Sequence, residues 1–201
     1  MRFDYTQIFL ILWIILFWVY HFASYGKVEG QHEKSMKEKY GGSAIWQSLF
    51  GLSFIAWTAI ILIYFFHYNS INWIYRLSFI DYVPVKILAI MLMCFAFLLY
   101  FLFTISVGKS IKSGLTSGDK PLLVSTGIYK YSRHPAYLAF LIVSIGIFFI
   151  IPNVITLALL IYTCVATYGH TLGEEKKLIL LYGEDYKQYQ NNVGRFFSKI
   201  F

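Results

Sequence analysis

An arginine, a histidine and a proline stand where a polar loop meets a long apolar run. Arg133 and His134 come directly before Pro135, the first residue of that run. Proline suits the first turn of a helix, because its missing N–H has no partner to lose there. The remaining free N–H groups of such a turn, together with the Arg and His side chains, predict a site for an anionic group.

A second group of polar residues follows the next apolar run. His170 and Glu174 are spaced i and i+4, so they share one face of a helix, and Glu175 comes next. If the two apolar runs form a hairpin, these residues lie at the same membrane depth as Arg133, and Arg195 can return to them. Charged groups at a membrane edge are costly without a ligand or a partner. We therefore predict a site there. The simpler alternative is that Glu174 or Glu175 only pairs with Arg133 and fastens the ends of the hairpin.

Such groups suit a ligand with a carboxylate, a ribose diol and an aromatic base. S-adenosylmethionine has all three, and its sulfonium cation is favoured by carboxylates and aromatic faces. The residues alone do not separate it from a dinucleotide. The Gly- and Ser-rich loop of residues 106–127 adds backbone that can approach a ligand closely.

Hydrophobic residues make up 58% of the 201 residues and charged residues 13%, which indicates an integral membrane protein. Five apolar runs each approach the ~20 residues that a spanning helix needs. They are Gln7–Ala23, Ala44–Phe66, Pro84–Val107, Pro135–Ile151 and Asn153–Leu172. We predict an all-α bundle of five transmembrane helices, in one domain (1–201) whose cofactor-binding and catalytic part is about 106–201.

Two features refine this bundle. Pro152 ends one run and Asn153 starts the next, which predicts a tight helical hairpin from the last two spans. Beyond the hairpin, apolar and aromatic residues recur every three or four positions over residues 173–193. That spacing predicts an amphipathic helix lying at the membrane interface.

The basic residues orient the bundle. Of the 17 Lys and Arg residues, 14 fall on one side of a five-span topology and 3 on the other. The larger set is Lys27, Lys34, Lys37, Lys39, Lys109, Lys112, Lys120, Lys130, Arg133, Lys176, Lys177, Lys187, Arg195 and Lys199. The positive-inside rule then predicts an outside N-terminus and a cytosolic C-terminus and active site. The net charge of +7 has no nucleic-acid motif behind it, and Cys94 and Cys164 have no metal-binding spacing.

The motifs resemble one known family. The first motif consists of Gly127, Tyr129, Arg133, His134, Pro135 and Tyr137, and the second of Glu174, Glu175, Leu178, Tyr182, Gly183, Tyr186 and Tyr189, before a terminal Arg195-Phe196. Over residues 122–197 this pattern resembles the isoprenylcysteine carboxyl methyltransferase family, and related membrane enzymes methylate phospholipid amines. Two departures are Pro121, where the family often has His, and a missing Trp-Ser pair early in the loop.

The resemblance implies a membrane methyltransferase that uses S-adenosylmethionine on the cytosolic side, with a lipid-like acceptor entering from the bilayer. Its motif positions imply cofactor contacts from Leu123, Val124, Gly127, Tyr129, His134, Pro135, Tyr137, His170 and Glu174. They imply catalytic roles for Glu174 and Glu175, a bracing role for Arg133, and an acceptor-facing or tail-locking role for Arg195.

Two other functions remain open from the sequence. Sterol or steroid reductases that use NADPH carry a similar Arg-His-Pro-x-Tyr in their C-terminal segments, and a non-catalytic lipid-binding protein would need no cofactor. For a methyltransferase, the acceptor could be a prenylated cysteine, an amino phospholipid or a small thiol.

Overall fold

The computed structural model describes residues 4–40, 44–67, 76–114 and 123–198, and its elements there are helical apart from one isolated bridge pair. This result confirms the predicted all-α class. The helices are α1 (Tyr5–Tyr40), α2 (Ala44–Phe66), α4 (Val83–Gly114), α5 (Pro135–Ile150), α6 (Val154–Tyr182) and α7 (Glu184–Asn192), with short 3-10 turns η1 (Ser78–Ile80) and η2 (Gly127–Lys130).

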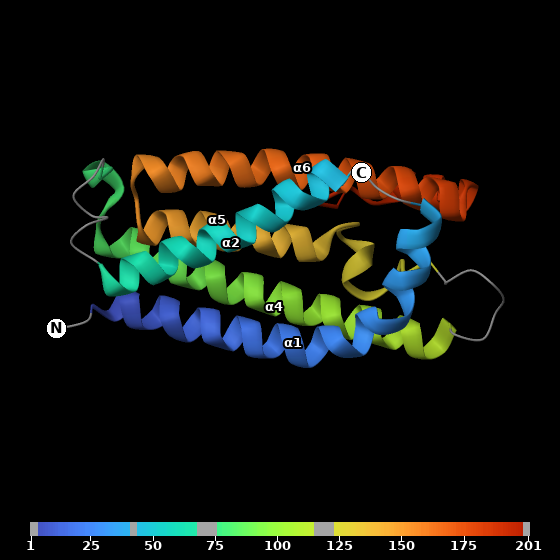
Figure 1. Cartoon of the computed structure of the whole chain (residues 1–201), viewed down its shortest axis with the longest axis horizontal. Helices are drawn as coiled ribbons and strands as arrows, with labels where there is room; N and C mark the ends of the chain where they lie inside the picture. The colour runs from blue at the N-terminus through green and yellow to red at the C-terminus, as the bar shows by residue number, and fades with distance from the viewer. Residues whose placement is uncertain (1–3, 41–43, 68–75, 115–122, 199–201) are drawn as a thin grey trace.

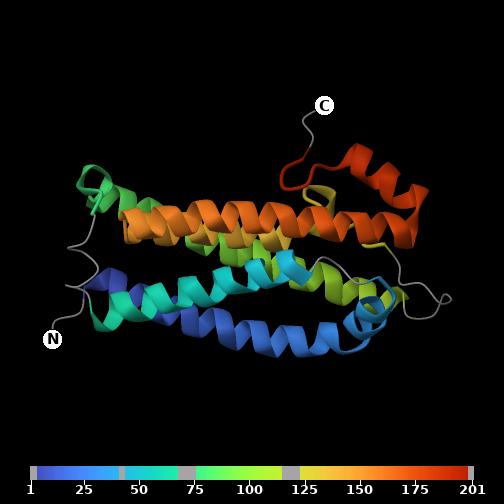
Figure 2. The same ribbon diagram turned by 45° about the horizontal axis from the view of Figure 1, so that its top comes forward.

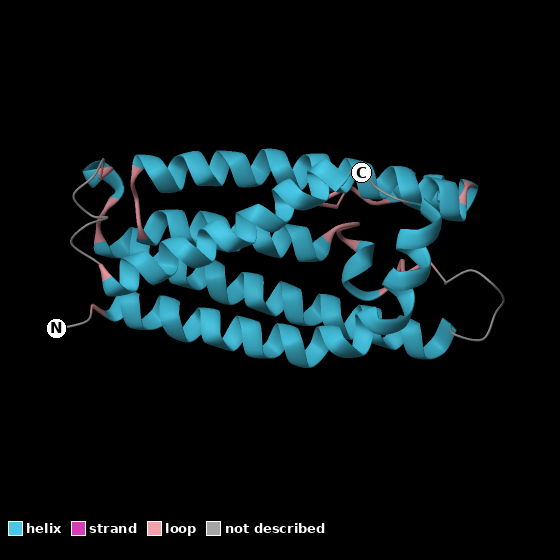
Figure 3. Cartoon of the chain, in the orientation of Figure 1, coloured by secondary structure: helices cyan, strands magenta, loops and turns pink. Residues whose placement is uncertain are grey.

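The long helices lie side by side in one elongated bundle (Figure 1), and the same helices fill almost the whole of the secondary-structure view (Figure 3). The ends of α1, α4 and α6 meet at one end of the bundle, with η2 and the first turn of α5. Turning the molecule shows α7 folding back over α6 toward η2 (Figure 2). That end of the bundle therefore collects most of the predicted site.

Four helices are long and apolar enough to cross a membrane, over Tyr5–Ser24, Ile45–Phe66, Val83–Val107 and Val154–Tyr182. These helices agree with a multi-pass membrane protein. The predicted fourth run forms α5, which has only 16 residues and is about 24 Å long, against ~30 Å of hydrocarbon, so a fifth crossing stays a prediction. In Figure 1, α5 begins short of the bundle end that α4 and α6 reach.

The predicted hairpin between α5 and α6 is present. Asn153 caps α6: its side chain accepts from the Thr156 N–H at 2.8 Å, and Thr156 Oγ1 accepts from the Asn153 N–H at 3.2 Å. The Pro152 carbonyl accepts from the Leu77 N–H at 2.8 Å, which ties the turn to the segment before α4. Trp57 on α2 donates to Thr163 Oγ1 on α6 at 2.9 Å and joins the hairpin to the rest of the bundle.

The helix after Leu172 differs from the prediction. α6 continues through Gly173 to Tyr182, since the residues that follow are mostly good helix formers. α6 ends before Gly183, whose φ of +63° favours glycine, and α7 begins at Glu184. The predicted amphipathic segment is therefore two helices, and both glutamates share one helix with His170.

Candidate active site

Glu175 is the centre of a buried charge cluster. Its Oε1 accepts from Arg133 Nη2 at 2.7 Å and from Arg195 Nε at 3.0 Å, and it lies 3.1 Å from His134 Nε2. Its Oε2 accepts from Arg195 Nη2 at 2.7 Å and from Gln190 Nε2 at 3.3 Å. Only 4% of Glu175 is exposed. Both oxygens of this carboxylate are thus occupied within the Glu175 cluster (Arg133, His134, Glu175, Gln190, Arg195).

The segment 193–198, called the tail below, docks on the start of α5. The backbone N–H of Arg133 donates to the Gly194 carbonyl at 3.1 Å, and that of His134 to the Arg195 carbonyl at 3.0 Å. The Arg133 guanidinium also donates to the carbonyls of Gln190 and Val193, at 3.1 and 2.9 Å. The tail thus uses the N–H groups of the two residues before α5. Binding of an anion by the N–H groups of the first turn of α5 itself stays a prediction.

Glu174 has a different environment from its neighbour. Its side chain is 39% exposed, and its Oε2 lies 3.6 Å from His134 Nδ1, too far for a hydrogen bond. That oxygen is buried, yet it has no hydrogen-bond partner among the described residues. Since unpaired buried acceptors are costly, Glu174 is the carboxylate of this pair that can accept from a ligand.

Aromatic rings continue the site on the other side of His134. The His134 and Tyr137 rings are 5.6 Å apart, and Tyr137 OH lies 3.0 Å from His170 Nε2. His170 in turn stacks on Phe50 of α2, with ring centroids 4.9 Å apart. This aromatic cluster (Phe50, Tyr137, His170) faces the same end of the bundle as Glu174. Two residues predicted from the motifs, Tyr137 and His170, therefore come together there.

The motif residues Gly127 and Tyr129 lie in η2, and they determine how η2 packs against α4 and α7. Gly127 has φ +63°, and a Cβ there would lie 2.5 Å from Ser106 Oγ on α4. The Tyr129 carbonyl accepts from Tyr189 OH at 2.7 Å. Burial raises the pKa of Tyr129 and of Tyr189, so both phenols stay neutral.

Leu123 packs against the α7 residues around Tyr186, and Val124 is half-buried beside it. Pro135 is the buried first residue of α5. Pro121, where the sequence departs from the family pattern, lies outside the described residues.

Three residues of this site had no clear signal in the sequence. They are Phe50, Tyr168 and Gln190, of which Tyr168 places its ring 4.9 Å from the Arg195 guanidinium carbon. Ser106 had one, as the first residue of the predicted Gly- and Ser-rich loop. Phe50 is one of many aromatics in apolar runs, and Gln190 is one polar residue of a polar helix. Only the folding-back of α7 and the tail brings Gln190 to Glu175. The hydrogen bonds that Arg195 donates to Glu175 raise the pKa of Arg195 and keep it charged.

The fold and the site define a class of protein, a membrane helical bundle with polar chemistry at one end. That end carries a closed charge cluster, one open carboxylate and aromatic rings. Residues 87–180 match the model of the isoprenylcysteine carboxyl methyltransferase (ICMT) family. The matched residues include α5, both glutamates and the motif around Arg133, so the similarity to this family falls on the candidate site.

Similar proteins match over comparable stretches. The protein-S-isoprenylcysteine O-methyltransferase of Saccharomyces cerevisiae is 36% identical over 74 residues, which are 36% of this chain and 31% of the yeast protein. That of Dictyostelium discoideum is 32% identical over 76 residues, 37% of this chain and 32% of the relative. The methanethiol S-methyltransferase of Pseudomonas deceptionensis is 37% identical over 70 residues, 33% and 25% of the two chains. The match thus spans less than a third of each of these relatives, and their names do not favour the reductase alternative.

Proposed function

We propose that the chain is a membrane methyltransferase that uses S-adenosylmethionine and acts on a lipid-like acceptor such as an isoprenylcysteine carboxylate. The observation that carries the proposal is the unpartnered Oε2 of Glu174 beside His134, inside the segment that matches the ICMT family. Most Lys and Arg residues lie in the C-terminal parts of α1, α4 and α6 or in the segments that follow α4 and α6, at this end of the bundle (Figure 1). That asymmetry supports five spans, an outside N-terminus and a cytosolic site.

The residues fit the proposed cofactor. A partly exposed carboxylate with a free oxygen suits a ribose diol, an amino group or the sulfonium cation, which aromatic faces also favour. Glu174, His134, Tyr137 and His170 are the groups that would hold it. We assign Leu123, Val124, Gly127 and Tyr129 to the wall that η2 builds beside it, without direct contact from their side chains.

When bound, S-adenosylmethionine would supply a methyl group for transfer to a lone pair of the acceptor, and its sulfur would keep the electron pair of the broken carbon–sulfur bond. The chain itself contributes position and exclusion of water. A carboxylate acceptor needs no base. For an amine acceptor, Glu174 would take the proton.

Glu175 has a separate role in this proposal. Its two oxygens are filled by Arg133, His134, Gln190 and Arg195, so it holds the tail closed and does not touch the reacting atoms. Arg133 is a second positioning residue, because among the described residues its guanidinium donates to Gln190 of α7, to Val193 of the tail and to Glu175. Phe196, with its ring centroid 6.5 Å from that of His134, covers the imidazole.

A direct assay distinguishes the candidate acceptors. Purified protein in lipid nanodiscs is incubated with methyl-labelled S-adenosylmethionine and, in separate reactions, an S-farnesylcysteine derivative, phosphatidylethanolamine and methanethiol. We expect label in the farnesylcysteine product as a base-labile methyl ester. Label only in the amine or only in the thiol would change the acceptor, and no label in any product would refute the function.

The site is tested with a matched pair of substitutions. Glu174→Gln should reduce turnover about 100-fold, the scale seen when a reacting group is misplaced by about 1 Å, while the protein stays folded. Glu184→Gln is the control, because its side chain is 85% exposed and pairs only with Lys187 at the surface. Wild-type turnover by the Glu174 variant would sink the assignment of this carboxylate.

A further inference from the structure

Helix α2 lies wholly before residue 87, where the family match begins, and it packs along α6. Two contacts fix its position there. The Trp46 ring lies so close to Gly169 that a Cβ on this glycine would be 2.3 Å from a ring carbon. Tyr162 OH donates to the Leu49 carbonyl at 2.7 Å, about two turns of α6 earlier. The register of α2 on α6 is therefore set on the stretch that carries Phe50.

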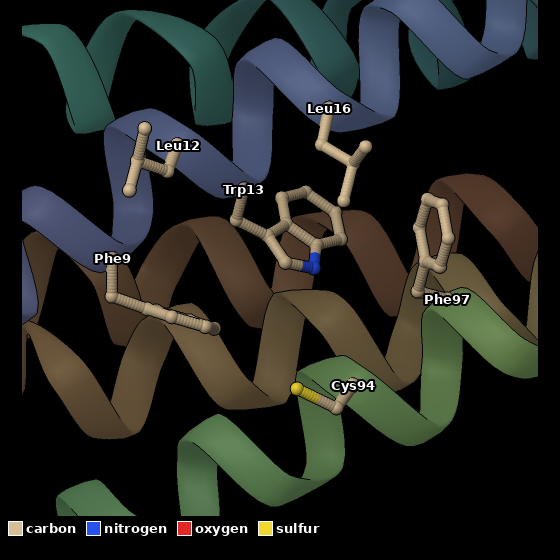
Figure 4. Close-up of a pocket in the computed structure, with 6 residues that line it drawn as sticks. All are labelled: Phe9, Leu12, Trp13, Leu16, Cys94 and Phe97. Carbon is tan, nitrogen blue, oxygen red and sulfur yellow. The ribbon is translucent and has the colours of Figure 1, made fainter.

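Helix α1, which comes before α2, has different neighbours. It packs against α2 and α4, and with α4 it lines an apolar pocket of about 250 Å³ (Figure 4). The side chains around this pocket are those of Phe9, Leu12, Trp13, Leu16, Cys94 and Phe97. They belong to the spanning segments Tyr5–Ser24 and Val83–Val107. α2, by contrast, brings an aromatic ring to the candidate active site.

The Phe50 ring touches both members of one hydrogen bond in the aromatic cluster. It lies parallel to the His170 ring, with centroids 4.9 Å apart and an interplanar angle of 5°. The same ring meets Tyr137 edge to face, at 5.1 Å and 84°. Tyr137 OH and His170 Nε2 are 3.0 Å apart. Phe50 thus contacts the phenol and the imidazole that this hydrogen bond joins.

These contacts restrict how the His170 ring can turn. The last side-chain torsion of a histidine has broad, roughly two-fold minima, so a single hydrogen bond at the ring edge leaves the tilt of the ring soft. A parallel ring at stacking distance fixes that tilt, because offset stacking has a preferred geometry. The Phe50 stack therefore sets the plane of the imidazole, and the bond to Tyr137 sets the direction of Nε2 within it.

Phe50 is itself held by neighbouring rings. It meets Phe54, one turn later on α2, at 5.1 Å and Phe140 of α5 at 5.5 Å, both edge to face. Phe54 in turn stacks on Phe140, with ring centroids 3.9 Å apart. Phe54 is thus a phenylalanine on the same helix whose ring packs on Phe50 and Phe140, and it provides a matched control for Phe50.

We propose that Phe50 is a positioning residue of the candidate active site, which acts through His170 on the binding of S-adenosylmethionine. The inference rests on the proposed function for the identity of that ligand. Phe50 fixes the plane of His170, one of the four side chains that would hold the cofactor. It makes α2 part of the site, although α2 lies outside the residues that match the family.

The first experiment measures the stack itself and needs no turnover. Protein with isotope-labelled histidine is placed in nanodiscs, and the NMR signal of the His170 ring is assigned as the one missing from His170→Gln. A stacked aromatic ring shields the protons above its face. We expect the His170 ring signal to be shifted upfield in the wild type and in Phe54→Leu, and to move downfield in Phe50→Leu. An unchanged His170 signal in folded Phe50→Leu would overturn the proposal.

The second experiment tests the route through His170. KM for S-adenosylmethionine and kcat are measured for Phe50→Leu, for His170→Gln and for the double variant. We expect Phe50→Leu to raise KM about two- to tenfold, the range expected for loss of one aromatic pair. The kcat value should change less than KM does, because Phe50 does not touch the reacting atoms. In the His170→Gln background the same substitution should leave KM unchanged, since the residue through which it acts is gone.

Two further variants separate positioning from packing. Phe50→Tyr keeps the stacked ring and should retain the KM of the wild type, as should Phe54→Leu, which removes a ring of the same size one turn away. Thermal unfolding of each variant is measured first, and Phe50→Met replaces Phe50→Leu if that variant does not fold. An equal rise of KM with and without His170, or an equal rise in Phe54→Leu, would refute the role in positioning.

The outcomes also separate Phe50 from the proposed function. Methyl transfer by Phe50→Leu with an unchanged His170 signal and an unchanged KM would refute the role of Phe50 and leave the methyltransferase proposal standing. A Phe50-dependent His170 signal in a wild-type protein that transfers no methyl group and binds no S-adenosylhomocysteine would confirm the stack. It would refute the methyltransferase proposal, and with it the role of Phe50 in binding the cofactor.

Discussion

Replacing Glu175 by Gln should damage stability far more than a substitution of Glu174. The change keeps the shape of the side chain, but it removes the negative charge that Arg133 and Arg195 share. It also turns an amide N–H₂ toward a guanidinium, donor against donor. The result is a pair of cations with no carboxylate between them.

The magnitude follows from the burial of the partners. Removing one partner of a buried ion pair costs about 3–5 kcal/mol. The side chains of Glu175 and Arg133 are 6% and 8% exposed, but that of Arg195 is 21% exposed, so water can hydrate part of its charge. We therefore expect about 3 kcal/mol, near the lower end. For a chain of this size that corresponds to a fall in Tm of about 6–12 °C.

The assay is thermal unfolding in nanodiscs at one scan rate, with Glu184→Gln as the surface control. A second variant, Glu175→Gln with Arg195→Gln, tests the pairing itself. The double variant should lose less than the sum of the single losses, by about 1–3 kcal/mol. If Glu175→Gln kept the Tm of the wild type and lost only turnover, Glu175 would act on the substrate, and our description of it as a positioning residue would be refuted.

Three further predictions concern the same end of the bundle. Gly127→Ala should lower Tm by about 2–8 °C, because φ +63° strains any Cβ and Ser106 lies in its way, whereas Gly51→Ala, with open space around it, should not lower it. Arg195→Lys should also lower Tm measurably, since lysine cannot reproduce the two-pronged contact with the carboxylate. Burial raises the pKa of Tyr186, so the folded state loses stability as pH rises past the unfolded value near ~10. Tyr186→Phe, whose lost hydroxyl has no partner among the described residues, should therefore lose less Tm than the wild type between about pH 9 and about pH 11.

Much of the site could be predicted from the sequence because local signals and topology agree there. Pro152 and Asn153 predict a turn, and a hairpin at that turn brings Arg133 and His134 to the level of Glu174 and Glu175. The structure confirms these contacts. It also brings Arg195 back to them, which the sequence allowed without requiring.

The different environments of the two glutamates could not be predicted. Neighbouring residues of a helix point about 100° apart. Glu174 and Glu175 therefore face different directions, and the sequence does not say which of them faces the tail. The choice depends on where Gly183 turns the chain and how the tail lies on α5. The continuation of α6 past Leu172 was missed for a related reason. Gly173 and the charges after it resemble a membrane boundary, although their helix propensity favours no break.

The pairing of Arg133 with the tail has a consequence for the order of events during synthesis. The Arg195 carbonyl that Ser132 contacts lies 63 residues further along the chain. At about 5–20 residues per second, that interval takes about 3–13 s. During this time the N–H groups of Arg133 and His134 lack their partners in the tail. Once Glu175 has been made, it can pair with Arg133 but not yet with Arg195. Helices α5 and α6 can thus be in the membrane while the Glu175 cluster is still incomplete, and arrival of the tail is the step that completes it.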